Sequence, residues 1–384
     1  HIGSLVQIMT LVHLQKAGHK PFVLVGGATG MVGDPSGKSA ERNLLDETTL
    51  NHNISCIKLQ LEKFLDFDCG ENSAEIVNNY DWFKDFNVLN FIRDIGKHIP
   101  VNYMMSKDSV KSRLETGMSF TEFTYQLIQG YDFYWLHQNK NCKVQLGGSD
   151  QWGNIVTGTE LIRRKGGGEA FACTTPLIKK ADGSKFGKTE GGNVWLDKTK
   201  TSPYKFYQYW INSSDEDAAN YIRIFTLKSK DEIEAIEVQH QEAPHLRILQ
   251  KSLANDITIR VHSEEDLNAA INASEILFKK GDEAVKDLKK MSSQVFEDVF
   301  EGVPQAKIAL SDIKQGITID EALSNKSNFL KSAGEARRAL KENSISVNKT
   351  KVSQEKVLNT DDLINGKYIL IQRGKKNYFV ILVY

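Results

Sequence analysis

The sequence has few of the residues that mark fibrous, membrane or disulfide-bonded proteins. Seven prolines and 28 glycines in 384 residues exclude a proline-rich or collagen-like chain. No apolar run approaches the roughly 18 residues of a membrane-spanning helix. We find no internal repeat. With 40% apolar and 26% charged residues, the composition predicts a soluble globular protein of two or three domains.

Cysteine is also scarce. The four cysteines, Cys56, Cys69, Cys142 and Cys173, form no C-x-x-C pair and have no histidine at zinc-ligand spacing. We therefore expect reduced thiols in a cytoplasmic protein and no bound metal. The chain opens at His1 with neither an initiator methionine nor a signal-peptide pattern, and we expect natural sequence to precede it.

The charge is balanced overall but uneven along the chain. Lys and Arg number 49, and Asp and Glu also number 49. Residues 316–384 hold 12 basic and 7 acidic side chains, a net charge of +5, so residues 1–315 carry −5. A basic tail on an acidic body indicates a polyanionic partner for the tail, although the same asymmetry can serve solubility alone.

The first part of the chain has the pattern of an α/β sheet. Apolar residues at helical spacing predict a helix over residues 4–17. The apolar run at 21–25 predicts a buried strand that ends in a glycine turn, and residues 143–150 repeat this order. Because ligands of such sheets bind beyond the carboxyl ends of the strands, the site is expected at these turns.

The rest of the chain divides into further segments by its pattern. Helical patterns cover most of residues 75–142, and a loop rich in Gly, Lys and Thr follows at 176–202. A basic helix at 332–342 and three short strands form the tail. The predicted domains are an α/β domain, a helical domain, a linker and a small α+β domain, at 1–202, 203–300, 301–316 and 317–384.

One glycine-bearing loop resembles a phosphate-binding P-loop without meeting its requirements. Gly33 and Gly37 are separated by three residues, whereas the P-loop needs four. We therefore reject that motif. The loop still brings Asp34, Lys38 and Arg42 together, either as a binding loop or as a solvated surface turn.

Three polar side chains share one face of a predicted helix. Tyr125, Gln129 and Asp132 are spaced i, i+4 and i+7. A phenol, an amide and a carboxylate together suit a polar ligand with an amine and a hydroxyl group. The same triplet, taken alone, also fits an exposed helix face.

Three further motifs fit phosphate and ribose binding. His1-Ile-Gly-Ser4 opens a helix, where unpaired N–H groups and the helix dipole favour anions. The segment 147–151 follows a strand, and a carboxylate there can bind ribose hydroxyls. The segment 185–189, Lys-Phe-Gly-Lys-Thr, puts two ammonium groups on a loop that can close over pyrophosphate. Each motif alone also fits an ordinary cap, turn or basic loop.

Together these motifs resemble a known family. A H-I-G start and a K-F-G-K-T loop around a nucleotide-type sheet are the paired signature of class I aminoacyl-tRNA synthetases. The chain is similar throughout to the tyrosyl-tRNA synthetases of bacteria and organelles, most specifically at 25–38, 119–132, 147–154 and 180–189. The tail resembles their S4-type RNA-binding domain. The resemblance implies a Rossmann-like catalytic domain at 1–202, with a dimerisation insertion at about 75–142.

The resemblance also implies an activity. The family activates L-tyrosine with ATP, accompanied by Mg²⁺, and esterifies tRNA(Tyr) with it; the family members are homodimers. The ATP phosphates, pyrophosphate and ribose are assigned to His1, Ser4, Lys38, Arg42, Gly148, Asp150, Lys185, Lys188 and Thr189. Tyrosine is assigned to Asp34, Asn79, Tyr125, Gln129, Asp132 and Gln151. The tRNA phosphates are assigned to Arg337, Arg338, Lys375 and Lys376.

Within this set, Asp132 would accept a hydrogen bond from the substrate phenol. A buried site built to bond a hydroxyl group rejects the analogue that lacks it, and tyrosyl-tRNA synthetases are a standard example. Asp34, Tyr125 and Gln129 would take the ammonium group, and Gln151 the carboxylate.

The sequence departs from the family pattern at two points, and two alternative functions remain open. Ser4 replaces a second histidine of the family motif, which weakens the expected ATP contact. The family's first strand, with a tyrosine and an aspartate of the pocket, falls before His1.

One alternative is a tryptophanyl-tRNA synthetase, which shares the fold but usually lacks an S4-type tail. The other is a non-catalytic RNA-binding relative, against which the intact Asp34, Asp150, Lys185 and Lys188 count.

Overall fold

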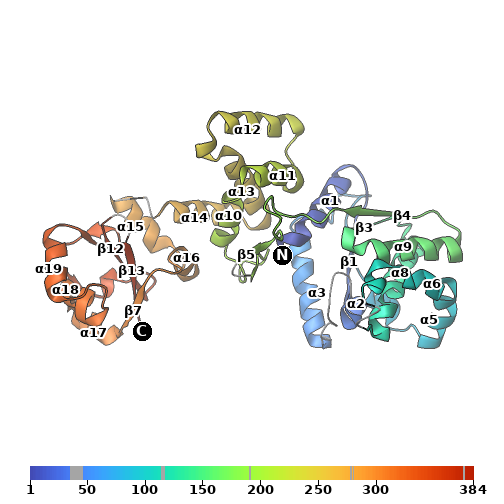
Figure 1. The fold of residues 1–384 in the computed structure, drawn as a ribbon, viewed down its shortest axis with the longest axis horizontal. Helices are drawn as coiled ribbons and strands as arrows, with labels where there is room; N and C mark the ends of the chain where they lie inside the picture. Colours follow the sequence, from blue (N-terminus) through green and yellow to red (C-terminus); the bar gives the residue numbers. More distant parts are fainter. Residues whose placement is uncertain (35–45, 114–116, 190–191, 277–278, 280, 375–376) are drawn as a thin grey trace. The chain divides into compact units, whose positions relative to one another are not determined.

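The computed structural model describes residues 1–34, 46–113, 117–189, 192–276, 279, 281–374 and 377–384 (Figure 1). The chain forms two compact units. The first comprises His1–Leu196 and Ser214–Gln239, and the second comprises Asp197–Ser213 and His240–Tyr384.

Parallel strands form the framework of the first unit, as the sequence predicts. β1 (Phe22–Val25) pairs with β2 (Glu75–Asn78), and β3 (Val144–Gly148) pairs with β4 (Phe171–Thr175), both in parallel. Parallel strands need a crossover between them. The crossovers contain α2 (Gly27–Val32) and α3 (Glu47–Leu61) in the first pair and α9 (Trp152–Leu161) in the second.

This unit also contains further helices. They are α1 (Leu5–Lys16), α4 (Tyr80–Phe83), α5 (Val88–Asp94), α6 (Val101–Met105), α7 (Asp108–Lys111), α8 (Phe120–Lys140), α11 (Asp215–Phe225) and α12 (Lys230–Glu242). An antiparallel pair, β5 (Lys188–Thr189) with β6 (Gly192–Asn193), completes the unit. The predicted helix at 4–17 and the predicted strands at 21–25 and 143–146 correspond to α1, β1 and β3.

The longest helix, α8, is held tightly against α9. A Cβ atom at Gly130 would lie 3.3 Å from the backbone N of Gly158, and one at Gly158 would lie 2.8 Å from Cβ of Phe133. Glycine at both positions therefore lets the two helices approach each other closely, side by side (Figure 1). This crossing fixes the middle of α8, which carries Tyr125, Gln129 and Asp132.

The second unit combines helices with a mixed sheet, in which all pairs but one are antiparallel. Its helices are α10 (Pro203–Ile211), α13 (Ile248–Val261), α14 (Glu264–Glu275), α15 (Gly281–Lys290), α16 (Ser293–Val299), α17 (Leu310–Gln315), α18 (Ile319–Glu321) and α19 (Ala333–Lys341). Its strands are β7 (Gln305–Ile308), β8 (Ile317–Thr318), β9 (Ile345–Val347), β10 (Thr350–Lys351), β11 (Val357–Leu358), β12 (Tyr368–Arg373) and β13 (Asn377–Val383).

The segment expected to be a linker, 301–316, forms a strand and a helix of the tail, β7 and α17. A five-stranded sheet has the order β10-β9-β12-β13-β7, and β7 pairs in parallel with β13. β7 is only four residues long and has its partner about 75 residues later, so the local pattern shows little sign of it. The tail sheet also shares a core with the helices, because Phe296 and Phe300 pack with Tyr368, Leu370 and Val380.

The two units divide the chain differently from the predicted domains, whose boundaries remain predictions. Helix α11 lies within the predicted helical domain but belongs to the first unit. Its Tyr221 and Phe225 contact the ring of Phe186, with Phe186 stacked on Phe225 at a centroid distance of 5.4 Å. Among the helices that the structure describes, none is long and apolar enough to cross a membrane.

Candidate active site

The centre of the site is a buried carboxylate on α8. Asp132 has no solvent exposure. Its Oδ1 accepts a hydrogen bond from the indole Nε1 of Trp82 at 2.9 Å, and its Oδ2 accepts one from Nδ2 of Asn79 at 3.1 Å. Burial raises the pKa of Asp132 to about 7, against the opposing effect of these two donors. Asp132 is therefore a buried hydrogen-bond acceptor whose two oxygens are each fixed by one donor.

Asn79 joins Asp132 to the helix that follows β1. Its side-chain Oδ1 accepts a hydrogen bond from the backbone N of Ala28 at 2.7 Å, and its Nδ2 also donates to Oγ1 of Thr29 at 3.0 Å. The preceding Asn78 accepts from the backbone N of Gly27 at 3.1 Å. The first turn of α2 is thus fixed by two asparagines at the carboxyl end of β2, and α2 leads directly to Asp34.

A second polar cluster surrounds Asp34. Gln151 donates from Nε2 to Oδ2 of Asp34 at 2.7 Å and to Oδ2 of Asp150 at 3.2 Å. Asn154, which is buried, donates from Nδ2 to Oδ1 of Asp34 at 3.5 Å and to Oε1 of Gln151 at 3.3 Å. Residues expected to bind the ammonium and carboxylate of one amino acid therefore lie within hydrogen-bond distance of each other.

Close backbone approach shapes the turn after β3. A Cβ atom at Gly148 would lie 2.5 Å from Oδ1 of Asp150, and one at Gly147 would lie 2.9 Å from Cδ1 of Ile155. A larger residue at Gly148 would displace the side chain of Asp150. One at Gly147 would displace the side chains of Ile155 and Gln151. The two glycines therefore place Asp150 at the carboxyl end of β3, where α/β sheets bind ligands.

The two signature motifs, one at the start of the chain and one at residues 185–189, contact each other. The backbone N of Ile2 donates to the carbonyl of Val194 at 3.0 Å, and the backbone N of Val194 donates to the carbonyl of Gly187 at 3.0 Å. Gly187 has φ +81°, and a Cβ atom there would lie 3.1 Å from Cγ1 of Ile2. The loop carrying Lys185 and Lys188 is thus packed on the turn that follows His1.

His1 is held in one tautomer by this turn. Its Nδ1 accepts a hydrogen bond from the backbone N of Gly3 at 3.0 Å, so the proton of the neutral ring is on Nε2. The ring also makes an edge contact with Trp195 at a centroid distance of 6.0 Å. Ser4, Lys185 and Lys188 are exposed, and Lys188 and Thr189 form β5.

Other predicted site residues divide into three groups. Tyr125 is buried and Gln129 is half-buried on α8, on the helix face predicted from their spacing. Arg337 and Arg338 are exposed on α19, and Nε of Arg337 donates to Oδ2 of Asp320 at 2.9 Å. Lys38, Arg42, Lys375 and Lys376 lie outside the described residues.

Comparison with known proteins assigns a family to this arrangement. The family described as tRNA synthetases class I (W and Y) matches residues 1–279, which is more than half of the chain. The chain belongs to this family. A second family, the tyrosine–tRNA ligase SYY-like C-terminal domain, matches residues 295–381.

Individual relatives of this class I synthetase agree. It is 62% identical to a tyrosine–tRNA ligase of Flavobacterium johnsoniae, over 100% of the chain and 90% of the relative. It is 58% identical to one from Bacteroides thetaiotaomicron with the same coverage. A C-terminally truncated mitochondrial tyrosyl-tRNA synthetase of Aspergillus nidulans matches with a TM-score of 0.63 and 29% identity, over 70% of this chain and 80% of that one.

Two contacts in the synthetase's site were not predicted. Neither Trp82, which binds Asp132, nor Asn154, which binds Asp34, was assigned a role from the sequence, although Asn154 lies within the segment 147–154. Trp82 is 50 residues from Asp132, and its ring stacks on Trp135 at a centroid distance of 4.3 Å. The sequence offers one local sign of the Trp82 contact: Asp132 and Trp135 are three residues apart on α8, so they lie on the same helix face.

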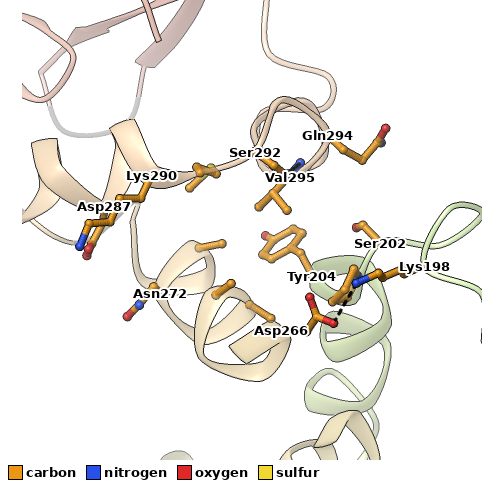
Figure 2. Close-up of a pocket in the computed structure, with 15 residues that line it drawn as sticks. Lys198, Ser202, Tyr204, Asp266, Asn272, Asp287, Lys290, Ser292, Gln294 and Val295 are labelled. Carbon is orange, nitrogen blue, oxygen red and sulfur yellow. Dashed lines mark hydrogen bonds and ion pairs between the residues drawn. The ribbon is translucent and has the colours of Figure 1, made fainter. Parts of the chain in front are cut away.

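A separate cavity of about 610 Å³ lies in the second unit (Figure 2). Tyr204 and Val295 project into it, and an ion pair between Lys198 and Asp266 at 3.6 Å lies at its edge. None of the residues predicted to bind tyrosine or ATP lines it. In the described part of the chain, no group of three His, Cys, Asp or Glu side chains is arranged to hold a metal ion.

Proposed function

We propose that the protein is a tyrosine–tRNA ligase. It binds L-tyrosine and MgATP, and the tyrosine carboxylate attacks the α-phosphorus of ATP. The new O–P bond replaces the bond to pyrophosphate, which leaves with its electron pair, and tyrosyl-adenylate forms. A terminal hydroxyl group of tRNA(Tyr) then attacks the activated carbonyl, which gives tyrosyl-tRNA, AMP and a proton.

Recognition of tyrosine depends on Asp132. When it is ionised, its two oxygens keep lone pairs after accepting from Trp82 and Asn79, so a phenol O–H can donate to it. Phenylalanine would leave this buried acceptor unpaired, which costs binding energy. Asp34, with Tyr125 and Gln129, takes the ammonium group, and Gln151 takes the carboxylate.

Activation needs charge stabilisation and no enzyme nucleophile, because the substrate carboxylate is itself the nucleophile. Because Nδ1 of His1 accepts from the backbone N of Gly3, the neutral ring has its proton on Nε2, from which it donates to a phosphate oxygen. Lys185 and Lys188 supply cationic charge from the loop packed against His1, and Ser4 and Thr189 supply hydroxyl groups. Lys38 and Arg42 close on pyrophosphate, and Gly148 and Asp150 bind the ribose.

The observation that carries this proposal is the buried Asp132 on the same helix face as Tyr125 and Gln129. The comparisons favour tyrosine over tryptophan as the substrate, because the tyrosine–tRNA ligase C-terminal domain family matches residues 295–381 and relatives at 62% and 58% identity are tyrosine–tRNA ligases. ATP–pyrophosphate exchange with each amino acid in turn tests it. Exchange with tyrosine alone is expected. Exchange with tryptophan would favour the alternative enzyme, and no exchange would favour a non-catalytic RNA-binding protein.

Binding of tRNA is assigned to the basic tail. Arg338, exposed on α19, contacts a phosphate, together with Arg337, Lys375 and Lys376. We expect Arg338→Ala to weaken tRNA binding and to make the log–log salt slope shallower by about one unit. Tyrosine-dependent exchange should not change. An unaltered slope would exclude Arg338 from the tRNA contact.

A homodimer in the cytoplasm completes the proposal. On and near α5, Val88, Leu89, Ile92 and Val101 are exposed apolar side chains within the predicted dimerisation insertion. All four cysteines are free thiols, as in a reducing compartment. Light scattering of wild type and Leu89→Asp tests the surface, since the charge should shift the mass towards that of one chain.

A further inference from the structure

A buried ion pair secures the first turn of α8. Nη1 of Arg113 donates to Oε1 of Glu122 at 3.0 Å, and Nη2 donates to Oε2 at 3.2 Å. Both residues are at least 90% buried. The side chains of this pair are less exposed than those of the pairs Arg260–Asp256 and Lys279–Asp287.

Each partner of this pair also holds the backbone that leads into the helix. Ser119 and Glu122 form a capping box, in which the Glu122 carboxylate accepts from the backbone N of Ser119 at 3.3 Å. Arg113 donates from Nη2 to the carbonyl of Gly117 at 3.3 Å. The pair therefore ties the helix start to the end of α7, whose last residue, Lys111, is two positions before Arg113.

Glu122 lies on the same stripe of α8 as the tyrosine site. The spacings from Glu122 to Tyr125, Gln129 and Asp132 are three, seven and ten residues, which places all four on one helix face. Asp132 is fixed at the far end of this stripe by Asn79 and Trp82. Tyr125 and Gln129 therefore lie between two anchored points.

A buried ion pair contributes little net stability, because desolvation of the two charges offsets their attraction. Its bidentate geometry instead fixes the distance and rotation between the two groups. We propose that Arg113 and Glu122 are positioning residues for tyrosine, which act by setting the rotation of α8 and so the direction of Tyr125 and Gln129. This inference rests on the proposed function.

Two variants of the full-length protein test it. Arg113→Lys keeps the charge but loses the fork geometry. The double variant Arg113→Met with Glu122→Leu replaces the pair by apolar side chains of similar size, and keeps the test possible if the lysine variant folds poorly. In each we expect the KM for tyrosine to rise by about tenfold or more, while the KM for ATP stays within about twofold. The melting temperature of the double variant should fall by only a few degrees, because the hydrogen bonds to Ser119 and Gly117 are lost while the cost of burying two charges is removed.

Arg223→Lys is the matched control. Arg223 forms a bidentate pair with Glu237 at 2.6 and 2.9 Å in the same unit, and no substrate role is assigned to it. Its KM values should not change. The inference is overturned if the folded variants keep the wild-type KM for tyrosine, or if both KM values rise together. If wild type itself shows no tyrosine-dependent exchange, the proposed function fails and the positioning role fails with it.

Discussion

Replacing Asp132 with asparagine should remove a pH-dependent contribution to the unfolding free energy of the protein. The pKa of this carboxyl is raised by burial from 3.8 to about 7 in the folded protein. A raised carboxyl pKa means that the folded state binds the proton more tightly than the unfolded state. Its contribution to stability is therefore complete below pH 3.8 and is lost as the pH rises through about 7. Asparagine removes this titration.

The size of the effect follows from the two pKa values. Between pH 5 and pH 8 the wild-type protein should lose about 3 kcal/mol of unfolding free energy through Asp132, and the variant should not. The amide that replaces the carboxylate would also set an N–H group against Nδ2 of Asn79, which costs about 1–3 kcal/mol at both pH values. The stability of wild type relative to the variant should therefore fall by about 3 kcal/mol between the two pH values.

Thermal unfolding of both proteins at pH 5 and pH 8 measures this difference. For a unit of this size the expected change in the difference of melting temperatures is about 6–12 °C. Asp94→Asn is the control. The hydrogen bond from Arg93 lowers the pKa of Asp94, so this carboxyl is ionised in both states across the range. If the difference for Asp132→Asn were the same at both pH values, Asp132 would not be a buried, proton-binding acceptor.

Three more predictions concern the same site. Lys188→Ala should lower the rate of adenylate formation by about tenfold or more with an almost unchanged KM for tyrosine, as measured by pre-steady-state kinetics; a lost affinity for tyrosine at a normal rate would contradict its role. Gly187→Ala should reduce activation more than Gly183→Ala, because both have a left-handed backbone but only Gly187 packs on Ile2; equal exchange rates would exclude this contact. Trp82→Phe removes a hydrogen-bond donor that lowers the pKa of Asp132, so the pKa should rise. The acidic limb of the pH profile of tyrosine activation should then move to higher pH, and an unmoved limb would refute the effect of Trp82 on Asp132.

The sequence could predict those parts of the site that depend on local spacing. The i, i+4, i+7 pattern put Tyr125, Gln129 and Asp132 on one face, and α8 confirms the helix. The strands β1 and β3 with their glycine turns were also evident, because buried parallel strands are short apolar runs. The resemblance to the synthetase family then supplied roles that no spacing alone would give.

What the sequence could not predict depends on partners distant along the chain. The Trp82–Asp132 bond joins residues 50 apart, and the Asn154–Asp34 bond joins residues 120 apart. β7 has no clear local signal because its pairing with β13 makes it a strand. Nothing in the sequence pattern distinguishes Arg113 from the many exposed arginines; only the fold buries it against Glu122. These are tertiary contacts, which local patterns do not encode.

The central claim is that this protein activates tyrosine and that Asp132 recognises its phenol. Comparing kcat/KM for tyrosine and for phenylalanine in ATP–pyrophosphate exchange, in wild type and in Asp132→Asn, tests it most directly. Wild type should favour tyrosine by about 10⁴-fold or more, since the site binds a hydroxyl group that phenylalanine lacks. The variant should lose most of this preference through a lower value for tyrosine. Equal discrimination in the two proteins would contradict the assignment of Asp132, and exchange with neither amino acid in wild type would contradict the function.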